Sequence, residues 1–100
     1  MAGMIQKELS FVGVLAGASS TKLAHVMTYD GEIQMYRVAC NSSLVTVELL
    51  LNGISTQLNF EGDNIPLYIT VNQGDEISVK VTNGDSASQT VYVMLLMLEF

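Results

Sequence analysis

Stretches rich in Val, Ile, Leu, Thr and Tyr follow one another along the chain, separated at short intervals by pairs of Gly, Asn and Asp. β-Branched and aromatic residues favour strands, whereas Gly, Asn and Asp favour the tight turns between them. The pattern predicts an all-β chain of about eight antiparallel strands. That number is typical of a two-sheet β-sandwich of the jelly-roll kind, and we expect one such domain over residues 1–100.

The clearest predicted hairpin spans residues 43–60. Asn52-Gly53 supplies the two residues with positive φ that a two-residue type I′ turn requires. This turn sets Leu51 opposite Ile54, and a slip of one residue would turn the apolar face into water, so the register is specified. Counting outward from the turn pairs Leu49 with Thr56, Val47 with Leu58 and Val45 with Phe60.

Two further hairpins are predicted from the same kind of turn. Asp30-Gly31 separates residues 22–29 from residues 32–40, and pairing across it places His25 opposite Tyr36, as a surface or edge residue. Residues 67–71 and 77–81 alternate in the same way around a second turn, and we expect them to form another antiparallel pair. The predicted sandwich core consists of Val45, Val47, Leu49, Leu58, Phe60, Leu67, Ile69, Ile77, Val79, Val91 and Val93.

The first twenty residues carry a weaker pattern. Ile5, Leu9 and Phe11 alternate with polar residues, which predicts a first strand that frays into Gly13–Ser20. The alternative for residues 1–20 is an extended, partly flexible arm. The pattern leaves both open.

The last strand, over residues 89–100, is apolar on both faces. Val91, Val93, Leu95 and Met97 share one side, and Tyr92, Met94, Leu96, Leu98 and Phe100 share the other. A sheet with one wetted face needs only one apolar side, so a second layer is expected over this strand. We predict that Met94, Leu96, Leu98 and Phe100 form an oligomer interface. The alternative cover is the N-terminal segment, through Ile5, Leu9, Phe11 and Val12.

Composition agrees with burial beyond a single core, because 49% of residues are hydrophobic and 14% are charged, against about 25% charged in a typical soluble domain. The net charge of −6 comes from scattered residues, which disfavours nucleic-acid binding. Neither a signal peptide nor a transmembrane helix is predicted, since two glycines interrupt Phe11–Ala18. We therefore expect synthesis in the cytoplasm and no membrane partner.

Residues that could carry chemistry are few. Cys40 is the only cysteine, which excludes an internal disulfide, and His25 is its only possible imidazole base. The acidic residues mostly flank turns, where they solvate the chain and bond to the backbone. Asp63 and Asp85 lie in clusters that offer oxygen ligands to calcium, although neither cluster has a calcium-loop spacing. We predict no enzyme activity, no cofactor and no metal, and the calcium alternative stays open.

Three stretches carry a family resemblance: residues 36–43 (YRVACNSS), residues 65–77 (IPLYITVNQGDEI) and the terminal strand ending in residues 98–100 (LEF). From about residue 23 to residue 100, the chain resembles the small jelly-roll virion proteins of tailed bacteriophages. These are the capsid decoration, or cement, proteins and related modules of necks and tail fibres.

The resemblance implies a non-enzymatic structural protein of the virion, made in the host cytoplasm. It implies a symmetric homo-oligomer, most often a trimer, with partners such as the major capsid protein. The alternatives are a phage neck or tail-fibre module and a receptor- or carbohydrate-binding β-sandwich, which would show an exposed aromatic patch. A small hydrolase would instead need a pocket holding His25 or two close carboxylates.

Overall fold

The computed structural model describes residues 5–40, 42–58 and 62–100, which form eight strands. They are β1 (Ile5–Leu15), β2 (Ser19–Val26), β3 (Gly31–Cys40), β4 (Val45–Leu51), β5 (Ile54–Leu58), β6 (Gly62–Val71), β7 (Glu76–Asn83) and β8 (Gln89–Glu99). β-Branched residues and leucines at alternate positions make each strand fit a half-buried, pleated sheet.

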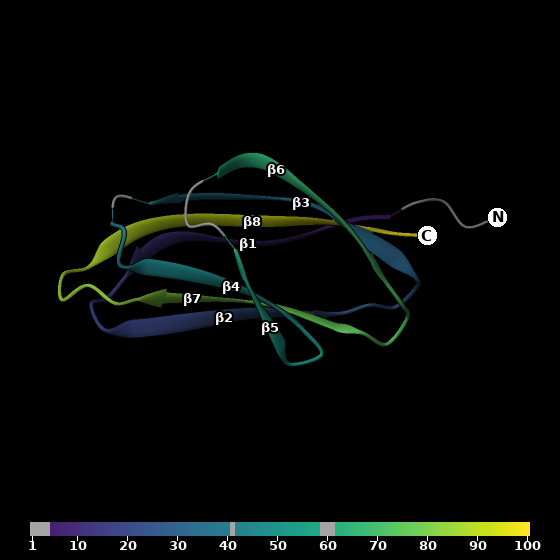
Figure 1. Ribbon diagram of the computed structural model, residues 1–100, viewed down its shortest axis with the longest axis horizontal. Helices are drawn as coiled ribbons and strands as arrows, with labels where there is room; N and C mark the ends of the chain where they lie inside the picture. Colours follow the sequence, from purple (N-terminus) through teal and green to yellow (C-terminus); the bar gives the residue numbers. More distant parts are fainter. Residues whose placement is uncertain (1–4, 41, 59–61) are drawn as a thin grey trace.

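The strands form two four-stranded antiparallel sheets. Sheet A has the order β1-β8-β3-β6, and sheet B has the order β2-β7-β4-β5. Figure 1 shows sheet A as the upper layer and sheet B as the lower layer of an elongated sandwich. The interleaved order is that of a jelly roll, so the predicted fold class is confirmed.

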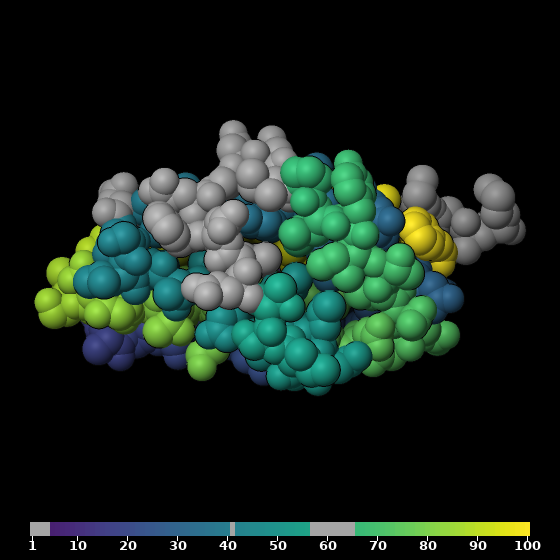
Figure 2. Space-filling view, in the orientation of Figure 1, coloured from purple at the N-terminus to yellow at the C-terminus, as the bar shows by residue number. Residues whose placement is uncertain are grey.

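The β4–β5 hairpin is confirmed in its turn and its register. Asn52 has φ 52° and Gly53 has φ 83°, the pair of positive values that the type I′ turn requires. Leu51 lies opposite Ile54, Leu49 opposite Thr56 and Val47 opposite Leu58. The predicted pairing of Val45 with Phe60 lies outside the described residues. In Figure 2 this hairpin, in teal, and β6, in green, are visible on the side that faces the viewer.

The predicted hairpin at Asp30-Gly31 is wrong. β2 pairs with β7 in sheet B, whereas β3 pairs with β6 and β8 in sheet A, so residues 27–30 cross between the sheets. Gly31 is buried, and a Cβ there would overlap the backbone carbonyl of Leu98 and lie 2.7 Å from Cε of Met27. The glycine thus permits a close approach of strands, a requirement that turn chemistry alone does not reveal.

The predicted pairing of residues 67–71 with residues 77–81 is also wrong, because β6 lies in sheet A and β7 lies in sheet B. The connecting residues 72–75 cross between the layers at the right-hand end of Figure 1. They bind the other crossing segment: Gly74 N–H donates to the carbonyl of Met27 (2.8 Å), and Met27 N–H donates to that of Asp75 (2.9 Å). Backbone bonds between two crossing loops therefore close this end of the sandwich.

The core lies between the sheets and contains most of the predicted residues. Seven of them are buried: Val45, Val47, Leu49, Ile77, Val79, Val91 and Val93. Leu67 and Ile69 are partly buried against this core, whereas the side chains of Leu58 and Phe60 lie outside the described residues. The core list omitted the inward side of β3, where Ile33, Tyr36 and Val38 are buried.

The predicted first strand is present and continues through Leu15, past the glycine where the pattern indicates fraying. It pairs with β8 along its whole length, from Ile5 opposite Glu99 to Leu15 opposite Gln89. A turn follows in which Ala18 has φ 54° and its N–H donates to the carbonyl of Asp85 (3.0 Å).

Candidate interaction surface

β8 lies between β1 and β3 in sheet A, so its side chains alternate between the core and the outer face of the sheet. The inward residues, Val91, Val93, Leu95, Met97 and Glu99, are all buried. The outward residues after the exposed Thr90 are Tyr92, Met94, Leu96 and Leu98, and all four are partly exposed. We call these four residues the outer stripe. It contains three of the four predicted interface residues.

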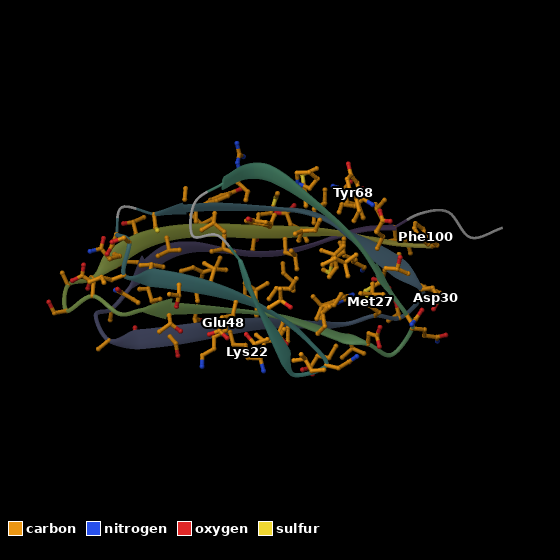
Figure 3. The ribbon with its side chains drawn as sticks, in the orientation of Figure 1. Lys22, Met27, Asp30, Glu48, Tyr68 and Phe100 are labelled. Atoms are coloured by element: carbon orange, nitrogen blue, oxygen red, sulfur yellow. The ribbon has the colours of Figure 1, made fainter. Side chains whose placement is uncertain are left out.

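The fourth predicted residue, Phe100, follows β8 and is 50% exposed. Its backbone N–H donates to the carbonyl of Asp30 (2.8 Å), so the residue is held against the crossing segment of residues 27–30. Figure 3 shows Phe100 at the same end of the molecule as Met27 and Asp30. Phe100 therefore lies at one end of the outer stripe.

Neighbouring strands place different residues on the two sides of the outer stripe. Going from Leu98 towards Tyr92, the outward residues of β1 are Gln6, Glu8, Ser10 and Val12, which we call the β1 flank. Along the same direction, the outward residues of β3 are Glu32, Met35, Arg37 and Ala39, which we call the β3 flank. Each flank is mixed, whereas the stripe between them is apolar.

β1 lies beside β8 in the same sheet, and this arrangement bears on what covers the stripe. Leu9 and Phe11 point inward and pack against the core, and Val12 points outward and is 66% exposed. Residues 5–15 thus extend sheet A sideways. The eight described strands form only these two sheets, so no third layer of strands covers the outer stripe, although the Arg37 guanidinium lies 5.9 Å from the centre of the Tyr92 ring.

A bulge on the same outer face exposes an aromatic side chain. The register of β3 shifts between Ile33 and Met35 against both β6 and β8. In β6, Tyr68 adopts φ 52° and is 68% exposed. Positive φ is unusual for an aromatic residue and costs energy, and bulges often redirect a side chain. Figure 3 shows Tyr68 on the side of sheet A that faces away from sheet B.

Glu99 is the last residue of β8, and its carboxylate lies on the inward side of the strand with 0% exposure. Its Oε2 accepts hydrogen bonds from the Thr28 hydroxyl (2.6 Å) and from the N–H groups of Thr28 (2.9 Å) and Tyr29 (3.2 Å). His25 Nε2 lies 3.0 Å from Oε1. The Thr28 hydroxyl, together with His25 and the two N–H groups, lowers the pKa of Glu99 from 4.5 to about 2, although burial opposes that shift.

His25 is therefore not opposite Tyr36, as predicted, but opposite Ile77 of β7, with a side chain 22% exposed and paired to Glu99. The pair joins sheet B to sheet A beside the crossing segment. One sequence feature could have identified this site: Glu99 continues the inward series of β8. A carboxylate at an inward position needs partners to be buried.

The remaining candidates for chemistry do not come together. Cys40 is opposite Val91, whereas His25 binds Glu99, and eight residues along one strand span about 26 Å. Cys40 Sγ lies 3.4 Å from the carbonyl oxygen of Ser42. Among the described residues, no three His, Cys, Asp or Glu side chains are grouped so that they could hold a metal ion.

Asp85 lies in the loop between β7 and β8 and fixes that loop. Its carboxylate accepts hydrogen bonds from the Ser42 hydroxyl (3.1 Å), the Gln89 amide (3.1 Å) and Ala87 N–H (3.2 Å). The Ala87 N–H, followed by the Ser42 hydroxyl, holds the pKa of Asp85 below its ordinary value of 3.8. These contacts use both carboxylate oxygens of Asp85, one of the two residues around which the sequence suggests a calcium site. The side chain of Asp63 lies outside the described residues.

Comparisons with known proteins give no family. No family model matches the chain, and no curated protein is recognisably similar to it. Within the part of the chain that the structure describes, no helix is long and apolar enough to cross a membrane.

Proposed function

We propose that this chain is a non-enzymatic structural protein of a bacteriophage virion, a capsid decoration protein that assembles as a symmetric homo-oligomer through the outer stripe. The outer stripe is the observation that carries the proposal. Tyr92, Met94, Leu96 and Leu98 follow one another along the central region of sheet A, and no second layer of described residues covers them. An apolar surface of this kind marks an interaction site.

The fold and the sequence resemblance add to the proposal in different ways. The jelly roll is a common architecture of virus capsid proteins, but it also hosts lectins and other functions, so the fold alone assigns none. The resemblance supplies the virion role, the trimer and the major capsid protein as partner. In this assembly a neighbouring copy covers the stripe.

The oligomer is tested first by light scattering on the purified protein at micromolar concentration. We expect a trimer, and a monomer would contradict the proposal. Leu96→Glu places a charge in the apolar contact and should dissociate the oligomer without unfolding the subunit. The matched control is Leu50→Glu, which places the same charge on the outer face of sheet B and should leave the oligomer intact.

The virion role is tested by immunogold electron microscopy of particles from the phage that encodes the chain. We expect label over the capsid surface. Label confined to the neck or tail would replace decoration with the alternative of a neck or tail-fibre module. Particles without label would contradict a structural role in the virion.

A second candidate, a receptor- or carbohydrate-binding module, is favoured by the exposed ring of Tyr68. Aromatic faces stack on the apolar faces of sugars, and the strained backbone at this residue presents the ring to solvent. Binding to an array of bacterial surface glycans that Tyr68→Ser abolishes would support this candidate. An array without bound protein would contradict it.

A further inference from the structure

β1 pairs with one neighbour only. It forms an edge of sheet A, and every one of its residues lies opposite a residue of β8. Leu15 is buried, and Leu9 and Phe11 pack partly against the core, but most of the other side chains of the strand are exposed. Backbone pairing with β8, more than buried side chains, therefore holds β1 in place.

The turn that joins β1 to β2 is strained. It consists of residues 16–18, in which Ala18 adopts φ 54°. The left-handed region is unfavourable for alanine, because its Cβ comes too close to the following carbonyl oxygen. Gly17 is pressed against the loop before β8, and a Cβ there would overlap the backbone carbonyl of Ser86. Short connections under strain favour the exchange of an element between copies, since the strain is released when the connection extends.

The hydrogen bonds that close the turn are mostly kept in an exchange. The side-chain amide of Asn83 donates to the carbonyls of Leu15 (3.0 Å) and Ala16 (3.3 Å). These carbonyls belong to the end of β1 and move with it, so an exchanged strand brings the same acceptors. The bond from Ala18 N–H to the carbonyl of Asp85 (3.0 Å) is the one in the segment that must extend.

We propose that β1 is an exchangeable strand, and that β1 of one copy pairs with β8 of a second copy in the register that it has within one subunit. Residues 16–18 then run from one copy to the other, and Ala18 leaves the left-handed region. A second copy is the partner because its β8 matches β1 from Ile5 opposite Glu99 to Leu15 opposite Gln89. The exchange uses the edge of β8. It therefore goes beyond the proposed contact through the outer stripe and does not depend on it.

Two pairings compete for β1. Its own β8 is reached across a short connection, which gives the strand a high effective concentration there. Strain at Ala18 reduces that advantage, and a higher protein concentration favours the β8 of a second copy. Exchange should therefore occur when chains fold together in concentrated solution and be absent when they fold in dilute solution.

Crosslinking between β1 and β8 tests the proposal. Val14 and Thr90 are exposed and lie opposite each other, so a short thiol-to-thiol crosslinker can join cysteines at these two positions. One chain carries Val14→Cys, the other carries Thr90→Cys, and both carry Cys40→Ser to remove the natural thiol. The two chains are unfolded and refolded together in concentrated solution. We expect a crosslinked pair of chains on a denaturing gel.

The matched control uses the same two chains folded separately and then mixed. A contact through the outer stripe forms in both samples, whereas strand exchange requires that the chains fold together. The sample refolded together should give at least about five-fold more of the crosslinked pair, because folded copies release β1 only as slowly as they unfold. Equal yields in the two samples would overturn the proposal.

A variant of the turn tests the source of the exchange. Ala18→Gly removes the strain from the closed turn, so it should lower the yield of the crosslinked pair at least about three-fold. An unchanged yield would overturn residues 16–18 as the strained hinge. If Val14→Cys unfolds the chain by circular dichroism, Ser10→Cys with Met94→Cys repeats the experiment at another level of the same two strands.

The outcomes separate the exchange from the proposed function. Equal yields remove the exchange and leave the outer-stripe oligomer, which is measured on chains that folded separately. A monomer by light scattering after dilute refolding removes the outer-stripe oligomer, while a crosslinked pair from concentrated refolding still supports the exchange.

Discussion

The two outer faces of the sandwich differ in what their central strands present. The outer face of sheet A has the apolar stripe of β8 at its centre. On sheet B, one row across the outer face places Lys80 of β7 between Lys22 and Glu48. The next row consists of Ser20, Thr82 and Thr46. Figure 3 shows Lys22 and Glu48 on the lower layer.

The inner faces of the two sheets are alike, since both supply valines, leucines and isoleucines to the core. A third row on the outer face of sheet B, Ala24, Ser78 and Leu50, includes apolar side chains. That outer face is therefore mixed, whereas the outer stripe of sheet A is apolar at four successive outward positions. The difference supports the proposed contact between subunits through the outer stripe, and the following predictions test that proposal.

The largest effect is expected within β8, where adjacent leucines face opposite ways. Leu95 is fully buried, so Leu95→Ala should lower the free energy of unfolding by about 2–5 kcal/mol through lost burial and a new cavity. Leu96→Ala should cost the isolated subunit less than about 1 kcal/mol, as changes at partly exposed positions do. Urea unfolding at dilutions that separate the subunits measures both. Equal losses would place the outer stripe in the subunit's own core.

An intermediate effect is expected at Glu99, the polar exception on the inward side of β8. Its pKa in the fold is about 2, below the ordinary 4.5, so the charged form stabilises the fold above about pH 4.5. That contribution is lost as the pH falls towards 2. Glu99→Gln should cost about 1–3 kcal/mol at pH 7, since hydrogen bonds to a charged group become bonds to a neutral one.

The measurement is the urea midpoint of both proteins from pH 7 to pH 2. The two curves should approach each other at the acid end, because protonated Glu99 is also neutral. The pKa values of Asp75 and Asp85 are also lowered, mainly by hydrogen bonds from the backbone N–H groups of Asn72 and Ala87 respectively. Both proteins should therefore lose stability in acid. A gap between the curves that is independent of pH would mean that the charge of Glu99 does not stabilise the fold.

The smallest effect, and one of opposite sign, is expected at Tyr68. Tyr68→Gly removes the strain of φ 52° and should raise the stability of the isolated subunit by up to about 1 kcal/mol, because glycine adopts positive φ freely. Thermal unfolding of the two subunits gives the comparison. A loss of stability would show that the Tyr68 ring packs against its own subunit. The outer face of sheet A would then offer less free surface to a partner than the exposure of Tyr68 indicates.

The sequence predicts local geometry here better than it predicts sheet membership. Alternation along residues 91–98 identified both faces of β8, and Asn52-Gly53 fixed the register of a hairpin. Asp30-Gly31 and the turn at residues 72–75 have the same local chemistry, yet both connect different sheets. What decides their paths is long-range contact, such as Gly31 against Leu98 and Met27 against Gly74. No periodic pattern encodes those contacts.

The candidate surface was predictable for a related reason. An outward apolar series is visible in the alternation, and the structure places Met94, Leu96 and Leu98 on one face. The flanks were not predictable, because they depend on β1 and β3 being the neighbours of β8 and on a bulge near Tyr68. The role of Glu99 required knowing that the segment of residues 27–30 crosses beside it.

The pairing of β1 with β8 has a consequence for the order of events during synthesis. Residues 5–15 find their partner only when residues 89–99 emerge, several seconds later at about 5–20 residues per second. Folds dominated by such distant pairings reach the native state in about milliseconds to seconds once complete. In that interval β1 is an unpaired strand, and Lys7, on the inward side of its edge, disfavours pairing with a wrong strand. Two nascent copies that exchanged β1 would satisfy the same backbone hydrogen bonds, so a dimer with swapped β1 strands would compete with the folded monomer.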